Sequence, residues 1–74
     1  MNRDYYIECM VKYKGRLERK QKELAGLKGE IKLSFQKQEP FFVIEGLTKK
    51  CKKLQLEIND VKQDILWAEG HLSR

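Results

Sequence analysis

The chain has 74 residues and a formal net charge of +5, and 41% of its residues are hydrophobic while 36% are charged. This length allows one small domain, whose core alone would be marginally stable. The regular spacing of the apolar residues argues against disorder, and there is neither an 18-residue apolar run nor a charged-then-apolar leader. We therefore expect a single domain over residues 1–74 that does not cross a membrane.

Apolar residues recur every three or four positions in the first half of the chain. Seven of the ten positions in this series are apolar, and the series is Arg3, Tyr6, Met10, Tyr13, Leu17, Lys20, Leu24, Leu27, Ile31 and Ser34. The spacing predicts a helix over about 3–35. Lys20 interrupts the apolar stripe, and we expect its long stem to lie along the stripe with its amine in water. Gly15, Gly26 and Gly29 lie off the stripe and weaken this helix.

A proline-containing segment separates the two halves. Pro40 disfavours helix at the residue before it and suits a first helical turn, which predicts a turn over about 36–40. The second half is uniformly periodic, and its nine stripe positions are all apolar: Ile44, Leu47, Cys51, Leu54, Ile58, Val61, Ile65, Ala68 and Leu72. We expect a helix over about 41–72. Because residues 41–46 also have the composition of a strand, a short β-hairpin of 31–35 with 41–45 stays open as an alternative.

Two equal helices joined by a short turn favour an all-α fold, namely an antiparallel two-helix coiled-coil hairpin. Facing residues should then have numbers that sum to about 75, which places Leu24 beside Cys51, Leu17 beside Ile58 and Tyr6 opposite Ala68. The alternative is a parallel pairing of the second helix with its own copy. Its β-branched residues at one core position and Leu at the other are typical of parallel coils.

Several large apolar residues fall outside both stripes. They gather near the chain ends and near the turn, and they are Tyr5, Ile7, Val11, Leu33, Phe41, Phe42, Leu56, Leu66 and Trp67. A small chain needs more core than two helices supply, so we expect a homodimer that forms a four-helix bundle. Residues of this kind also anchor other proteins. The predicted partner-binding residues are Tyr5, Ile7, Val11, Phe41, Phe42, Leu66 and Trp67.

Basic residues concentrate in two runs that the antiparallel register brings together. We call them the lysine band, and its members are Arg16, Arg19, Lys20, Lys22, Lys49, Lys50, Lys52 and Lys53. Such a band can steer an acidic protein or neutralise phosphates of a nucleic acid. The simpler interpretation is a solvated helix face whose lysines pair with neighbouring carboxylates. No known nucleic-acid-binding motif accompanies the band.

Catalytic chemistry has little support in the sequence. His71 is the only histidine and lies near the C-terminus, where we expect an exposed, frayed residue. Cys9 and Cys51 are far apart in the predicted register, so we expect two reduced thiols, as in a cytoplasmic protein. Two cysteines and one histidine do not make a usual zinc site. We expect no enzyme activity, no cofactor, no metal and no small-molecule substrate.

These observations together predict a non-enzymatic, intracellular protein–protein interaction module. The small size of the chain suggests a phage or mobile-element accessory protein that binds and modulates a host protein, for example as an inhibitor. The alternatives are a small basic dimer that binds DNA or RNA and a structural coiled-coil subunit of a larger assembly.

Overall fold

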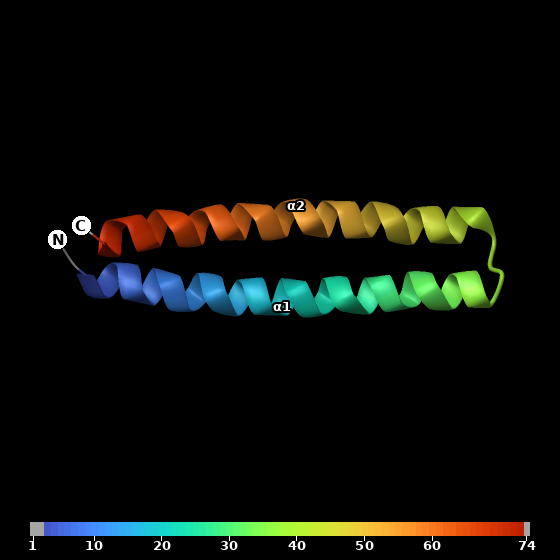
Figure 1. Ribbon diagram of the computed structural model, residues 1–74, viewed down its shortest axis with the longest axis horizontal. Helices are drawn as coiled ribbons and strands as arrows, with labels where there is room; N and C mark the ends of the chain where they lie inside the picture. The colour runs from blue at the N-terminus through green and yellow to red at the C-terminus, as the bar shows by residue number, and fades with distance from the viewer. Residues whose placement is uncertain (1–2, 74) are drawn as a thin grey trace.

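The computed structural model describes residues 3–73 and consists of two antiparallel helices, α1 (Arg3–Gln36) and α2 (Phe41–Leu72). They lie side by side as a rod of 56 × 14 × 13 Å, with both chain ends at one end and the turn at the other (Figure 1). The predicted all-α hairpin is confirmed, and its helix bounds agree to within a residue. Residues 1, 2 and 74 of the predicted domain lie outside the described part of the chain.

No strand occurs within residues 3–73, so the alternative β-hairpin at the turn is wrong. Residues 31–35 complete α1, and residues 41–46 form the first turns of α2. Pro40 decides the outcome, because its backbone has φ −56° and ψ 147° directly before α2 and its carbonyl accepts the Val43 N–H at 3.0 Å. The strand-like composition of Phe41 to Gly46 therefore yields to the helix start that the proline favours.

The end of α1 is closed by backbone hydrogen bonds of the Schellman type. The N–H of Glu39 donates to the Ser34 carbonyl at 3.0 Å, and the N–H of Gln38 donates to the Phe35 carbonyl at 3.1 Å. Gln38 has φ 55°, the left-handed conformation that this motif requires and that glycine adopts most readily. The Ser34 hydroxyl, which is buried, also donates to Glu39 Oε2 at 3.4 Å. These bonds reverse the chain within four residues.

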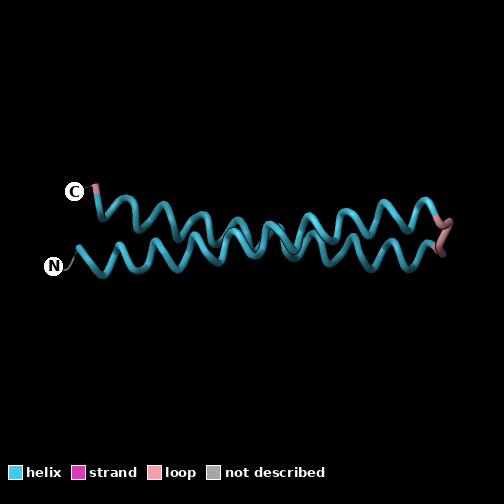
Figure 2. Tube along the Cα trace, turned by 90° about the horizontal axis from the view of Figure 1, so that it is seen from below, coloured by secondary structure: helices cyan, strands magenta, loops and turns pink. Residues whose placement is uncertain are grey.

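One seam between α1 and α2 forms the core. Leu24, Leu54 and Ile58 make its central cluster, and Leu17, Leu27 and Cys51 pack against them. These neighbours show that the predicted stripes of the two helices pack against each other. All nine predicted stripe residues of α2 are buried or half-buried, and so are those of α1 except Arg3. The two traces cross at a shallow angle, as coiled-coil helices do (Figure 2).

Lys20 occupies the seam as predicted. Its side chain is only 25% exposed, and its Nζ lies 3.6 Å from Glu57 Oε1 on α2. The stem thus fills a core position, while the amine reaches the edge of the seam and pairs with a carboxylate. This ion pair is the single salt bridge between the two helices within residues 3–73.

Candidate protein-interaction surfaces

The hairpin leaves many large apolar side chains in solvent. All nine residues that were predicted to lie outside the stripes are exposed, and Phe35 joins them. Phe41 and Phe42 are the most exposed, at 76% and 73%. Sequence analysis missed Phe35, although its position immediately beside the seam residue Ser34 is the signal that could have found it.

Heptad positions sort eight of these ten residues onto two flanks of the seam, while Phe42 and Leu56 fall at the outer position f. With Leu24 and Ile58 at position a, the seam occupies positions a and d of both helices. Positions e and b lie on one side, the e/b flank, and positions g and c on the other, the g/c flank. The e/b flank carries Ile7, Val11, Phe35, Phe41 and Leu66. The g/c flank carries Tyr5, Leu33 and Trp67.

Four rings form a terminal aromatic cluster on the g/c flank, and its members are Tyr5, Tyr6, Trp67 and His71. Tyr6 stacks on His71 with ring centroids 4.7 Å apart and planes 4° from parallel. Trp67 meets Tyr6 edge-on at 5.5 Å and His71 at 4.7 Å, and Tyr5 meets Tyr6 at 5.3 Å. The expectation of a frayed, exposed His71 is therefore wrong: the residue is helical and half-buried. The cluster holds the Trp67 ring in place while leaving 46% of the residue exposed.

Cys9 lies between two tyrosines of α1, one helical turn from each. A side-chain hydrogen bond with Cys9 is the main cause that raises the pKa of Tyr5, and desolvation, followed by Cys9, raises the pKa of Tyr13. Both phenols therefore lose their proton at a higher pH than an ordinary tyrosine. Cys9 and Cys51 are both free thiols, as predicted.

Ile7, Val11 and Leu66 make up a terminal apolar patch on the e/b flank. Each is exposed, and Val11 is 68% exposed. Ile7 on α1 occupies the same heptad position, e, as Phe35 at the other end of that helix, and Phe41 at the turn end of α2 also lies at position e. The e/b flank is thus apolar at both ends of the rod.

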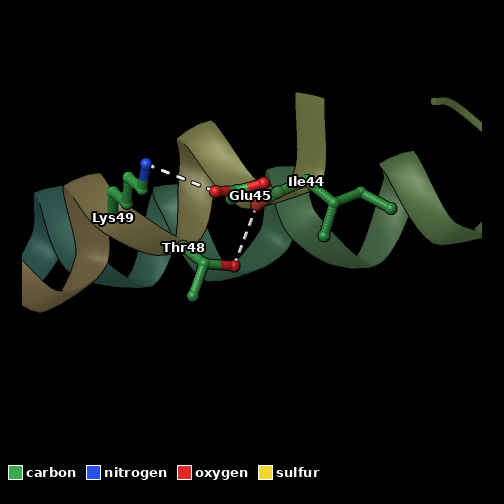
Figure 3. Close-up of polar contacts among 4 residues, drawn as sticks. All are labelled: Ile44, Glu45, Thr48 and Lys49. Atoms are coloured by element: carbon green, nitrogen blue, oxygen red, sulfur yellow. Dashed lines mark hydrogen bonds and ion pairs between the residues drawn. The ribbon is translucent and has the colours of Figure 1, made fainter. Parts of the chain in front are cut away.

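At the turn end, the e/b flank is hollowed. We call this depression of about 500 Å³ the tip hollow, and it is lined by Phe35, Phe41, Ile44, Glu45, Thr48, Lys49 and Lys52. Figure 3 shows two of its contacts: the Thr48 hydroxyl donates to the Ile44 carbonyl at 2.8 Å, and Lys49 pairs with Glu45 at 3.3 Å. With these groups satisfied inside α2, the hollow offers phenylalanine and isoleucine side chains and the cation of Lys52.

The heptad positions divide the lysine band among three faces. Arg16, Arg19, Lys50 and Lys53 lie on the g/c flank beside Lys20, whereas Lys22 and Lys49 lie at the outer position f and Lys52 lies on the e/b flank. Lys20, Lys22 and Lys49 each pair with a carboxylate, from Glu57, Glu18 and Glu45 respectively. Lys20, Lys50 and Lys53 line a shallow depression on the g/c flank together with Glu23 and Glu57, which offset much of its positive charge. Three of the eight band residues thus belong to a carboxylate-paired face, as the simpler interpretation expects.

The described residues contain no group of three or more His, Cys, Asp or Glu side chains placed to hold a metal ion. Between Arg3 and Ser73, no helix is long and apolar enough to cross a membrane. Comparison with protein-family models, curated proteins and solved structures found no match to the chain.

Proposed function

We propose that the chain is a non-enzymatic protein–protein interaction module that acts as a dimer of hairpins, forming four helices, and holds a further protein through Trp67 and Tyr5. The observation that carries this proposal is the balance of apolar residues. Seven are buried within the hairpin, whereas ten large ones are exposed. Exposed apolar surface on this scale is typical of interfaces.

The accessible surface supports the same proposal. It amounts to 5851 Å², whereas a folded monomer of 8.8 kDa exposes about 4,800 Å². The excess of about 1,100 Å² exceeds the roughly 800 Å² that one partner contributes to a standard interface. A second copy is the partner that is always present, so self-association is the simplest way to cover it.

Trp67 is suited to anchor a different protein. Trp and Tyr are the residues most enriched at binding hot spots. The contacts of Trp67 with Tyr6 and His71 fix its ring before binding, which reduces the entropy lost on association. The two free cysteines fit a reducing compartment such as the cytoplasm.

Sedimentation equilibrium of the full chain over a range of concentrations tests the dimer. We expect twice the 8.8 kDa mass of one chain, and a monomer with intact helical circular dichroism at every concentration would overturn the proposal. For the second partner, the native chain, Trp67→Ala and Leu56→Ala are compared as baits. Leu56 is the matched control because it is exposed and lies outside the aromatic cluster. We expect at least one protein to bind both the native chain and Leu56→Ala. The same protein should not bind Trp67→Ala.

Fluorescence anisotropy with labelled duplex DNA and single-stranded RNA covers the nucleic-acid alternative. Phosphate contacts by the lysine band would give binding that weakens about 10³-fold or more between roughly 50 and 200 mM salt. Such binding, lost on changing Lys49, Lys50, Lys52 and Lys53 to Gln, would replace the protein-partner proposal. We expect only weak binding, because part of the band is paired with carboxylates.

A further inference from the structure

We propose that the e/b flank is the contact between two copies packed antiparallel, so that the tip hollow of each copy receives the terminal apolar patch of the other. This inference rests on the proposed dimer and specifies its face and its orientation. The same residues then serve in both halves of the contact, as a two-fold axis requires.

The two ends of the flank are chemically complementary. The tip hollow combines Phe35, Phe41 and Ile44 with the cation of Lys52. At the other end, Ile7, Val11 and Leu66 are accompanied on the same flank by the carboxylates Asp4 and Glu69. Lys52 pairs with no carboxylate within residues 3–73, so it is available to an acidic partner surface. An apolar, acidic end therefore fits an apolar, basic hollow.

The positions of the two ends also match. At about 1.5 Å per helical residue, the hollow extends about 15 Å from the turn, and the terminal patch lies within about 12 Å of the open end. On a rod of 56 Å, full antiparallel overlap brings both hollows opposite both patches at once. A parallel arrangement would set hollow beside hollow and patch beside patch, with no complementary pair.

Charge along the rod favours the same orientation. Residues 21–55, the half near the turn, contain eight Lys and Arg against four Asp and Glu, for a net charge of +4. Residues 3–20 and 56–73 together contain seven of each and are neutral. A parallel pair would place two halves of +4 side by side, whereas the antiparallel pair places each against a neutral half.

The middle of the e/b flank is polar, with Lys14, Gln21, Lys28, Gln55 and Lys62. The apolar contact is consequently confined to the two ends of the pair, and the middle stays hydrated. The terminal aromatic cluster lies on the opposite flank. Trp67 and Tyr5 thus remain accessible in the dimer, as an anchor for another protein requires.

Engineered cysteines test the orientation directly. The background carries Cys9→Ser and Cys51→Val, where valine keeps an apolar residue in the seam, and circular dichroism must first show that the background remains helical. Ile7→Cys and Phe41→Cys are then made in separate chains, mixed and oxidised. A disulfide needs Cα atoms about 4.4–6.8 Å apart, and within one chain these two sites lie at opposite ends of the rod. We expect the mixture to form several-fold more disulfide-linked dimer than either variant alone.

The matched control is Tyr5→Cys mixed with Leu33→Cys, which places the same test on the g/c flank. Stronger linkage in this control, or in Ile7→Cys alone, would overturn the proposed face or orientation. Sedimentation of the same samples separates the two proposals. A dimer that links through other sites refutes only the antiparallel e/b contact, whereas a monomer at all concentrations refutes the dimer as well.

Discussion

Tyr6 near the start of α1 and His71 near the end of α2 stack with ring centroids 4.7 Å apart and planes 4° from parallel. This contact joins the two chain ends through side chains at the open end of the hairpin. The seam residue of α2 in this last part of the helix is Ala68, which is small and fully buried. Trp67 completes the closure by packing edge-on against both rings.

We predict that His71→Ala lowers the free energy of unfolding by about 0.5–1.5 kcal/mol, the usual contribution of an aromatic pair beyond its buried area. Urea unfolding followed by far-ultraviolet circular dichroism measures the change. Trp67 emission should shift to longer wavelength as its ring gains water. His71→Phe is the control, since it keeps a planar ring against Tyr6. Equal stability of the native and alanine chains would show that the stack contributes nothing.

The seam was predictable because its signal is periodic. An uninterrupted series of apolar residues from Ile44 to Leu72 leaves a single face on which α2 can pack, and Pro40 limits where the chain can reverse. These two features fix the helix bounds and the antiparallel arrangement together. The apolar residues outside this face could then be predicted to stay exposed, as they are.

The terminal aromatic cluster was not predictable in the same way. Heptad spacing places Tyr6 opposite Ala68, but it does not show that the tyrosine ring turns sideways onto His71. That contact depends on the side-chain conformations of both residues, which heptad spacing does not determine. Similarly, the clustering of lysines in the sequence does not show that Lys20, Lys22 and Lys49 each find a carboxylate.

The ion pair between Lys20 and Glu57 gives a second prediction. Replacing a partly buried ion-paired residue in a seam by an apolar one is often stabilising. We expect Lys20→Leu to raise the free energy of unfolding by about 1–2 kcal/mol, since leucine would continue the stripe between Leu17 and Leu24. Thermal and urea unfolding measure the effect. Lys22→Leu is the control: Lys22 is 77% exposed and pairs within α1, so we expect a change within about 0.5 kcal/mol.

Lys20→Leu should also broaden the oligomeric state. A polar residue at a single seam position specifies register and oligomer number at a cost in stability. Sedimentation of the leucine variant is therefore expected to show species larger than those of the native chain. If Lys20→Leu is less stable than the native chain, the lysine stem and its ion pair with Glu57 contribute more to the free energy of unfolding than leucine does at this position.

Gln38 offers a third prediction, because it holds φ 55° in the turn. A left-handed backbone is unfavourable by about 1–2 kcal/mol for a residue with a Cβ atom, and glycine removes that strain while loosening the unfolded chain. We expect Gln38→Gly to raise the free energy of unfolding by about 0.5–1 kcal/mol. The reverse control is Gln21→Gly at an exposed position in the interior of α1, which should lower it by about 1 kcal/mol. If both variants shift the urea midpoint in the same direction, the left-handed backbone at Gln38 does not carry the proposed strain.

The glycines of α1 provide the last prediction. A Cβ atom added at Gly26 or Gly29 would meet nothing within 4 Å, so the hairpin itself does not need them. Gly26→Ala and Gly29→Ala should each raise the free energy of unfolding by about 1 kcal/mol, the difference in helix propensity. Both positions lie off the e/b flank, so the dissociation constant of the dimer should not change. Ala25→Gly, the reverse substitution beside them, should lower stability by a similar amount. If the alanine variants stabilise the helix but weaken the dimer, the face of α1 that carries Gly26 and Gly29 lies in the contact between copies instead.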